Sequence, residues 1–439
     1  MSDALAYHRA TNVAAGGTDE DEERVVETRP VPFKDYGSAE RLPLETTVAG
    51  PLLQDGAGIV RSRTLAARQA PGRRDRGEVH FRGYSSAGAL YPVEAYVASE
   101  AGLLSFDPLG PSLVRLGGDV RAALAEAAAA PVREAFVVLT GIHARTGWKY
   151  MERGYRHIWW DAGTMLANLL ALAASDGLSP RLLTAFVDRE VNELLGVDGR
   201  HEYALAILGL GAEVEATQNR PSDRLLLREN GSGYPLAEAA HAASVLEDHD
   251  AVRAWRTAEG EPEPTLSRDE LVSAIRQRGS VREYSPQPLP LLNVERLLLW
   301  SLIAPMPADA PPVVRPWVTV NAVEGLEPGV YDAELRLIRA MPENELRARS
   351  GFAAMEQDHP RLAAFNVWLM ADVDGVVGRL GDRGYRWAQL EAGIRAGRVQ
   401  IGAFGRDWGA AASTFYDDEV SKLLGTDESP LLMVAVGSR

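Results

Sequence analysis

The alternation of apolar and polar residues in the first half of the chain predicts strands that flank a long buried helix. Apolar runs predict strands near Leu90–Ser99 and Ala135–Ile142. The apolar run Tyr155–Ser175 is longer, and its polar positions fit a helix in a protein core better than a membrane span. A short amphipathic helix over 188–196 and a closing strand over 203–211 are expected to follow.

The second half repeats this order of elements and part of its letters. The sequence "RGYR" stands at 153–156 and again at 383–386, each time at the start of a long helical pattern. The spacing of about 230 residues indicates a duplicated domain and not a solenoid of short repeats. The other matched segments are 102–118 with 325–341, 135–142 with 365–373, 188–196 with 417–425, and 203–211 with 430–437.

These patterns predict two tandem domains with the same order of strands and helices. Residues 1–30 are polar and acidic, and we expect a flexible N-terminal segment there. The first domain is predicted over 31–213 and the second over 264–439. Residues 214–263 are polar, with Pro and Gly at both ends and a helical middle, which predicts a linker packed on the surface.

Composition narrows the functional classes. The 439 residues suit two domains of ordinary size, and 46% hydrophobic with 24% charged residues is ordinary for a globular protein. The net charge of -15 disfavours nucleic acid and anionic membranes as partners. The chain has no cysteine, and no histidines have metal-ligand spacing, so no metal is expected. No signal peptide is recognisable, and a cytoplasmic location is expected.

Three stretches carry groups suited to chemistry, and the first is "FRGYSSAGALYPVEAYV", 81–97. It is a turn of small residues that leads into a strand. Small side chains over Ser85–Gly88 would let the backbone approach a flat ligand, with hydroxyl and N–H donors nearby. The alternative is an ordinary turn before a strand, which composition alone favours.

The second stretch is "RQRGSVREYS", 276–285, at the end of the predicted helix "SRDELVSAIRQ". Arg278, Ser280 and Arg282 alternate along it. Two guanidinium groups and a hydroxyl at this spacing suit a phosphate group. A solvated basic patch is the alternative.

The third stretch is the pair Lys149 and Tyr150, which the second half replaces with Arg379 and Leu380. An ammonium group beside a phenol would favour the phenolate, a usable general base. However, adjacent residues on a helix or strand do not share a face, so the pair alone favours a purely structural explanation.

Together these stretches resemble the FMN-dependent nitroreductase-like superfamily, and within it the SagB-type dehydrogenases. The family pattern of an Arg followed by Pro-Ser-small-Gly-small-Leu-Tyr-Pro stands here as "RGYSSAGALYP", with Ser85 in place of the proline. The family's Lys-Tyr followed by Arg-x-Tyr-Arg stands as "KYMERGYR". The opening "YHRATN" and "RPVPFKDYG" resemble the start of fused, double-length members.

The resemblance implies an α+β domain that dimerises and binds FMN at the dimer interface. One protomer would supply an Arg-x-Ser-x-Arg segment for the FMN phosphate, and the other a Ser-Gly turn against the flavin. A loop after the second long helix would contact the edge of the flavin, and Arg439 could add to the phosphate site. The implied cofactor-binding residues are Arg278, Ser280, Arg282, Arg82, Ser85, Ser86, Ala87, Gly88, Gly409, Ala410 and Ala411.

The two halves keep complementary parts of this pattern. The first half has "SSAG" and Lys-Tyr, but its "RSR" at 61–63 lies too close to the turn to serve as the phosphate segment. The second half has "RGSVR" but reads "MPADAPPVVRPWV" where the Ser-Gly turn is expected. We therefore predict an intramolecular pseudo-dimer with one complete FMN site and a second, decayed site.

The resemblance further implies oxidation of thiazoline and oxazoline rings to azoles in ribosomally made peptides. Tyr150 would be the base, with Lys149 lowering its pKa or sharing the role. The expected partner is an azoline-containing precursor peptide; a cyclodehydratase complex as a second partner and pairing into a further homo-oligomer stay open. The alternatives are an NAD(P)H-dependent nitro- or quinone reductase on the same scaffold, or a flavin-free scaffold subunit of a peptide-modifying complex.

Overall fold

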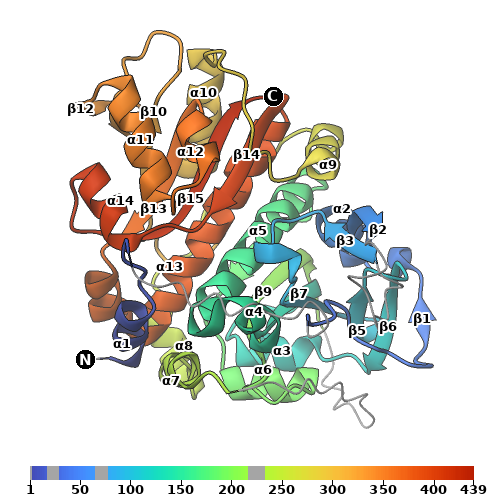
Figure 1. Cartoon of the computed structure of the whole chain (residues 1–439). Helices are drawn as coiled ribbons and strands as arrows, with labels where there is room; N and C mark the ends of the chain where they lie inside the picture. The colour runs from blue at the N-terminus through green and yellow to red at the C-terminus, as the bar shows by residue number, and fades with distance from the viewer. Residues whose placement is uncertain (1, 17–28, 65–77, 216–232) are drawn as a thin grey trace.

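Each half of the chain forms one domain with an antiparallel sheet, and the two domains lie side by side (Figure 1). The computed structural model describes residues 2–16, 29–64, 78–215 and 233–439. The structure confirms the predicted α+β tandem fold and the predicted pseudo-dimer. Two of the predicted segments are described only in part. The residues outside the description are 1 and 17–28 of the N-terminal segment and 216–232 of the linker.

The first domain is built on a seven-stranded sheet in the order β1-β6-β5-β4-β7-β9-β8. A separate hairpin, β2-β3, stands beside it. In chain order, the elements up to the end of this sheet are α1 (Asp3–Ala10), β1 (Arg41–Leu42), η2 (Leu44–Thr46), α2 (Ala49–Ala57), β2 (Ile59–Thr64), β3 (Glu78–Arg82), η4 (Ala87–Ala89), β4 (Val93–Ser99), β5 (Gly102–Asp107), β6 (Ser112–Gly117), α3 (Arg121–Ala127), β7 (Arg133–Ile142), α4 (His143–Tyr150), η5 (Met151–Arg153), α5 (Gly154–Ser175), β8 (Arg181–Leu183), α6 (Asp188–Leu195) and β9 (Glu202–Glu213).

The second domain repeats this plan with a six-stranded sheet in the order β12-β11-β10-β13-β15-β14. Two short helices, α7 and α8, join it to the first domain. The elements are α7 (Pro235–Ala243), α8 (His249–Trp255), α9 (Arg268–Gln277), α10 (Leu291–Leu298), η6 (Leu299–Ile303), β10 (Arg315–Val320), β11 (Gly329–Asp332), β12 (Leu337–Ala340), α11 (Glu343–Ala353), α12 (Asp358–Leu362), β13 (Phe365–Ala371), α13 (Val373–Phe404), β14 (Trp408–Ser413), α14 (Asp417–Leu424) and β15 (Ser429–Ser438).

The central strands are buried on both faces, which explains why their sequences are continuous apolar runs. On β4, Val97 faces a core that both domains share, whereas Tyr96 and Ala98 face a smaller core on the outer side of the sheet. The shared core also contains the long helices α5 and α13. The central strands therefore lack a period-2 alternation of polar and apolar residues.

The helices α5 and α13 form the centre of the domain interface and cross at a pair of glycines. A Cβ atom placed on Gly163 would lie 2.5 Å from the carbonyl oxygen of Leu390, and one on Gly393 would lie 2.6 Å from that of Trp160. These two glycines occupy equivalent places in the duplicated "DAG" and "EAG". Their missing side chains let the two backbones touch.

Reciprocal ion pairs lock this interface on both sides of the crossing. An aspartate at the start of α6 or α14 in one domain receives two arginines from the "RGYR" motif of the other domain. The pairs are Arg383 and Arg386 with Asp188 (2.6 and 2.7 Å), and Arg153 and Arg156 with Asp417 (3.0 and 3.1 Å). All six side chains are buried or nearly so, and each pair joins the two halves.

The predicted elements are largely confirmed, with differences at a few boundaries. The first expected strand begins at Val93 and not at Leu90, because 86–91 is a turn. The second long helix begins earlier than expected, at Val373, and bends at Gly381 (φ 67°). The expected flexibility of 1–30 does not hold for α1, whose apolar Ala4 and Tyr7 are buried and were hidden by the acidic composition of the segment.

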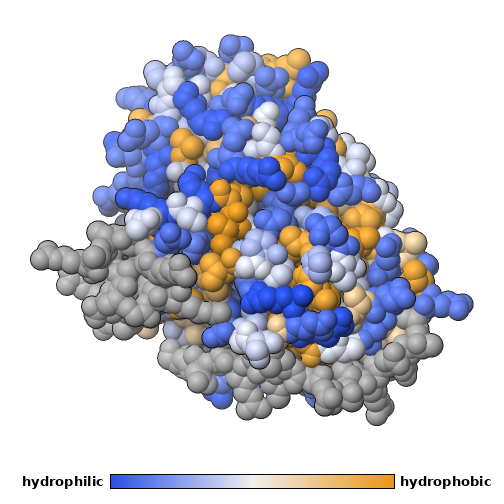
Figure 2. All heavy atoms as spheres, turned by 90° about the vertical axis from the view of Figure 1, so that its right-hand side faces the viewer, coloured by the Kyte–Doolittle hydropathy of each residue, from blue (hydrophilic) through white to orange (hydrophobic). Residues whose placement is uncertain are grey.

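The face of the molecule drawn in Figure 2 is predominantly hydrophilic, in keeping with the net charge of -15. On the face drawn in Figure 2, hydrophobic residues gather at mid-height, where the two domains meet. Among the residues that the structure describes, no helix combines the length and the apolar character that a membrane crossing requires.

Candidate functional site

The small-residue turn of the first domain has an unusual backbone. Gly88 has a φ of 62°, and the non-glycine residues Ala89 and Tyr91 also have positive φ values of 51° and 45°. Side chains disfavour this region, and each such residue costs on the order of 1 kcal/mol or more. The surrounding structure must therefore hold the turn in place, and strain of this kind is concentrated at functional sites.

Asp161 on α5 is the main support of the turn. Its Oδ2 lies 2.5 Å from the Ser86 hydroxyl, and its Oδ1 accepts a hydrogen bond from the Ala87 N–H at 3.2 Å. Burial raises the pKa of Asp161 to about 8, although these two hydrogen bonds act in the opposite direction. The neighbouring Thr164 donates to the carbonyl of Ser85 at 2.7 Å.

Arg278 connects the second domain to the same turn. Its Nε donates to the carbonyl of Gly83 at 3.0 Å, and its Nη2 donates to those of Arg82 and Tyr84 at 3.0 and 2.8 Å. The guanidinium is buried, and burial lowers its pKa, with Arg61 adding a smaller effect in the same direction. Arg278 therefore holds the backbone that leads into the turn, and only its Nη1 has no hydrogen-bond partner among the described residues.

The rest of the "RGSVR" segment runs along β14. The Val281 N–H donates to the carbonyl of Ala410 at 3.2 Å, and a Cβ on Gly409 would lie 2.6 Å from Val281 Cγ1. Gly409, Ala410 and Ala411 are thus on a strand and not on the loop expected from the sequence, because β14 pairs with β15 throughout. Ser280 and Arg282 are exposed.

Lys149 and Tyr150 lie in the last turn of α4, next to the small-residue turn. A Cβ on Gly88 would lie 3.3 Å from the Tyr150 hydroxyl oxygen, so the phenol lies directly beside that glycine. The Lys149 Nζ lies 5.3 Å from the centre of the Tyr150 ring, a distance at which cation–π attraction operates. The two neighbours therefore interact, contrary to the expectation for adjacent helical residues.

The Tyr150 ring is held by a neutral aromatic neighbour. It stacks on His157 with ring centres 4.0 Å apart and planes inclined by 20°. Burial lowers the pKa of His157 well below its usual value, and the charges of Arg153 and Arg156 add to this, so the imidazole is uncharged. Neither of its ring nitrogens has a hydrogen-bond partner within the described part of the chain.

Arg145 fixes the position of α4 relative to the turn. Its Nη1 lies 2.6 Å from Glu94 Oε1 on β4, and the same atom donates to the carbonyl of Tyr91 at 2.9 Å. Both charged side chains are buried. A buried pair of this type stabilises one geometry strongly, because removing either partner leaves an uncompensated charge.

Two of the predicted cofactor residues have other partners. Arg82 is buried, and its guanidinium donates to the carbonyls of Ala57 and, at a longer distance, Val93. It stabilises the strand ahead of the turn. Arg439 is exposed and contacts the carbonyl and carboxylate of Asp407. Neither arginine reaches the small-residue turn through a hydrogen bond.

The corresponding turn of the second domain is closed by backbone pairing. Residues 306–309 precede β10 as 85–88 precede β4, and they pair with β8, the counterpart of β14. The Leu182 N–H donates to the carbonyl of Pro307 at 2.7 Å, and the Asp309 N–H donates to that of Leu182 at 3.1 Å. The Asp309 carboxylate also accepts the Thr184 N–H at 2.8 Å.

Several residues of the site were missed by sequence reasoning, namely Asp161, Thr164, Arg145 and His157. A signal for Asp161 exists in the duplication, because Glu391 occupies the equivalent place in α13. Its Oε2 accepts the N–H groups of Val313 and Val314 at 2.7 and 3.1 Å, just before β10. An acidic residue at equivalent positions of two apolar helices indicates a shared role. In both domains it binds the segment that precedes a strand.

The protein is therefore a two-domain α+β protein whose candidate site is shared between its halves. The site is a strained turn at the domain interface, and residues of both halves support it. The sequence matches the family model "Nitroreductase family" over residues 64–212 and 275–438. Because these matches cover most of the chain, the protein belongs to the nitroreductase family, a family of oxidoreductases.

Individual relatives agree with this assignment. A protein of Methanocaldococcus jannaschii named "Putative nitroreductase" is 28% identical over 187 residues, which are 40% of this chain and 94% of its own. The crystal structure of a "putative nitroreductase" from Anabaena variabilis is 22% identical in sequence and has a TM-score of 0.80, and the match covers 100% of this chain and 99% of that one. The tandem fold is therefore shared along the whole chain.

Proposed function

We propose that this protein is an FMN-dependent dehydrogenase that oxidises azoline rings to azoles in ribosomally made peptides. The observation that carries the proposal is the Tyr150 hydroxyl beside Gly88, in a turn that the second domain supports through Arg278. The proposal joins this geometry to the family assignment and to the SagB-type pattern of the sequence. It requires a base and a flavin surface at one place, and both candidate segments meet there.

The residues present suit FMN. The small side chains of 85–88 and the backbone of β14 give a flat ring access to N–H and carbonyl groups. Ser280 and Arg282, in the same segment as Arg278, are exposed and suit a phosphate. Arg82 and Arg439 are left out of the proposed set because their guanidinium groups already have protein partners. Arg278 holds the turn through Nε and Nη2, so within the described part of the chain it offers a phosphate only its Nη1.

In the proposed reaction, one ring C–H bond breaks as a proton and a second as a hydride, and a ring double bond forms. FMN, when bound, accepts the hydride. Tyr150 takes the proton at its hydroxyl oxygen, and the Lys149 ammonium near its ring favours the ionised phenol. The neutral His157 holds the phenol ring in place by stacking. Molecular oxygen is the expected final oxidant.

The competing function is an NAD(P)H-dependent reductase, which the family assignment favours equally. It would use the same flavin surface but would need no base at Tyr150. Purified protein should therefore be assayed both for azole formation from an azoline peptide and for flavin-dependent NADPH oxidation with a quinone. Rapid NADPH oxidation without azole formation would select the reductase.

The first experiment is a count of flavin per chain. The protein is purified, its absorbance near 450 nm is recorded, and the released cofactor is identified and quantified. We expect about one FMN per chain, because the turn 306–309 is paired with β8 at the second place. Two FMN per chain would contradict the single site, and none after FMN is added would contradict the function.

The second experiment tests the base. Tyr150→Phe removes the hydroxyl and keeps the ring that stacks on His157, so FMN content should be unchanged while azole formation falls about 100-fold or more. Tyr416→Phe, at the N-terminal cap of α14, is the matched control and should keep the parent rate. A Tyr150→Phe variant that works at the parent rate would remove this residue from the mechanism.

A further inference from the structure

Residues 29–36, from the motif "RPVPFKDYG", form an arm that is anchored in the first domain. Phe33 and Lys34 of the arm are buried. The Lys34 Nζ lies 2.5 Å from Glu202 Oε2 on β9 and donates to the Tyr96 hydroxyl on β4 at 2.7 Å. A buried ion pair with these hydrogen bonds favours one geometry, because separating its charges would leave each of them uncompensated. The arm is therefore fixed to the sheet only a few residues after it begins.

The first residue of the arm, Arg29, binds the strained turn of the candidate site. Its Nη2 donates to the carbonyl of Gly88 at 2.7 Å and to that of Ala89 at 2.9 Å. These two residues are consecutive, and both have positive φ values, 62° and 51°. Because one nitrogen binds both oxygens, the two carbonyl groups converge on the guanidinium. Its charge strengthens both hydrogen bonds, which offset part of the cost of the left-handed backbone.

Side chains from three parts of the chain bind the carbonyl groups of this turn and of the residues that lead into it. Arg278 of the second domain and Thr164 of α5 hold the beginning of the segment, at the carbonyls of 82–85. Arg29 holds its other end, where Gly88 is exposed and the hydroxyl of the proposed base lies beside it. The arm therefore supports the part of the turn that is next to the proposed base.

We propose that Arg29 is a positioning residue of this site, which holds Gly88 and Ala89 in the conformation that receives the flavin. It acts through the turn and not on the reacting atoms. This role rests on the proposed function only for the identity of the ligand, FMN, and it is the same in an azoline oxidase and in a reductase. The motif "RPVPFKDYG" thereby gains a role, because the anchored arm brings the guanidinium to the turn. Without the guanidinium, the two residues can leave the left-handed region, and the surface for the flavin is lost.

The test is Arg29→Gln, which keeps a long polar side chain and removes the charge. Hydrogen exchange of the purified protein is followed by mass spectrometry, in peptides that contain the Ala89 and Leu90 N–H groups. These groups donate to carbonyls within the turn, so their exchange should become at least tenfold faster. The dissociation constant of FMN, measured by the recovery of flavin fluorescence on dilution, should rise about tenfold or more. Arg29→Lys should restore part of both, because an ammonium group also donates to two carbonyls.

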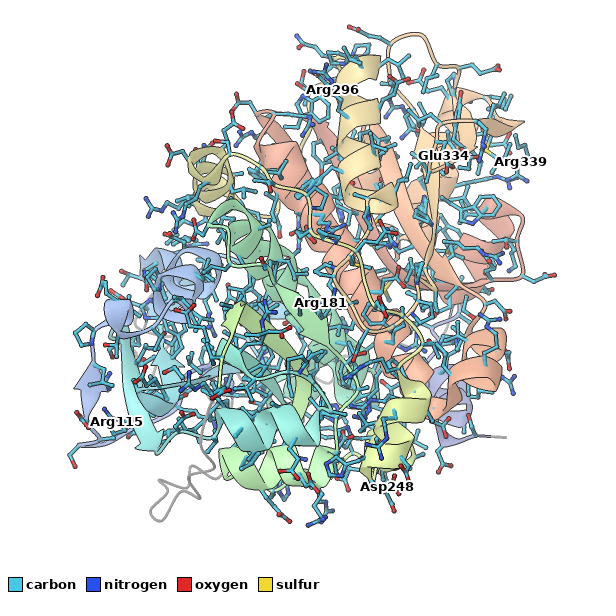
Figure 3. All side chains as sticks on the ribbon, turned by 180° about the vertical axis from the view of Figure 1, so that it is seen from behind. Arg115, Arg181, Asp248, Arg296, Glu334 and Arg339 are labelled. Carbon is cyan, nitrogen blue, oxygen red and sulfur yellow. The ribbon has the colours of Figure 1, made fainter. Side chains whose placement is uncertain are left out.

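Arg115→Gln is the matched control. Arg115 also binds the N-terminal part of the chain, with its Nε 2.6 Å from Glu40 Oε2, but it lies at the outer edge of the first domain, where Figure 3 labels it. This variant should keep the parent exchange rate of the turn and the parent affinity for FMN. A thermal melt verifies that each variant folds.

The outcomes separate this role from a merely structural one and from the proposed function. A folded Arg29→Gln variant with the parent exchange rate and FMN affinity would overturn the role, even if its Tm were lower. Equal losses in Arg115→Gln would also overturn it, because loosening the N-terminal part of the chain anywhere would then be sufficient. A parent that binds FMN but forms no azole would contradict the oxidase and leave the role of Arg29 intact. If the parent bound no FMN, the proposed function would fail, and the exchange rates would still decide the role.

Discussion

At the scale of single residues, one buried carboxyl group controls the geometry of the candidate site. Asp161 stands in a helix that is otherwise almost entirely apolar, and it contacts both a hydroxyl and an N–H of the turn. With a pKa of about 8, the group is largely protonated at neutral pH, so it can donate as well as accept. The turn is therefore tied to the protonation state of one side chain.

This protonation state predicts a pH dependence of stability. The folded pKa of Asp161 is raised above its unfolded value of 3.8, so the folded state holds the proton more tightly between these values. The stabilising contribution is complete at low pH and is lost as pH rises toward 8. We expect the Tm of the parent, relative to Asp161→Asn, to fall by a few degrees between pH 5 and pH 8, as measured by calorimetry. A constant difference would contradict the assignment.

Lys149 and Tyr150 show what residue identity alone can and cannot predict. The pair stands out through its resemblance to a family motif, while its spacing argues against any interaction. In the structure, the lysine side chain reaches back over the neighbouring ring because the helix ends there, at Met151 with a φ of 48°. The end of this helix is a feature of the backbone that the residue types at 149–151 do not predict.

At the scale of elements, the domain interface depends on two ion-pair clusters, which we call clamps. In one, Asp188 binds Arg383 and Arg386; in the other, Asp417 binds Arg153 and Arg156. Burial acts to raise the pKa of Asp188, but Arg383 and Arg386 outweigh it, and the pKa lies below its usual value. Asp417 is the equivalent residue of the second half and also accepts the N–H of Val13 at 2.8 Å. These clamps join α6 and α14 to the helices of the opposite domain.

Removing one clamp should therefore destabilise the whole protein. Asp417→Ala leaves Arg153 and Arg156 buried without their carboxylate, at a cost of about 3–5 kcal/mol in the free energy of unfolding. Asp418→Ala is a matched control, because that neighbour is exposed and its ion pair among the described residues is with Lys422 on the surface; its cost should stay below about 1 kcal/mol. Urea titration measures both, and equal losses would contradict the clamp.

The central strands and helices of each domain were predictable from the sequence, and the exceptions have physical causes. Long apolar runs such as 155–175 and 365–371 predict their helix and strand because burial on all sides allows few polar residues. The helix α1 was missed because a few buried side chains in an acidic segment do not form a pattern. The strand β14 stands where the family resemblance implied a loop, and its Gly and Ala residues lack the side chains that mark strands.

At the scale of the whole molecule, the fusion creates one core out of two domains. The shared core joins α5, α13 and both sheets, and α1 from the N-terminus packs against it. Tyr7 of α1 contacts the rings of both Tyr155 and Tyr385, which are the tyrosines of the duplicated "RGYR" motifs. The interface is symmetric because the two domains are duplicates. The two turns, 85–88 and 306–309, could diverge because both domains are fused in one chain.

Neither half should fold without the other, which a split chain can test. Cut between residues 224 and 225, each fragment alone would expose one apolar helix and a set of buried arginines, so we expect aggregation. Produced together, the fragments should associate and copurify. Gly393→Ala should reduce that association at least tenfold, because its Cβ would lie 2.6 Å from the Trp160 carbonyl oxygen. Gly378→Ala, on the same helix but with open space around it, is the control. Fragments that fold and stay monomeric on their own would show that each domain has an independent core, and the shared site would then form by docking and not by folding.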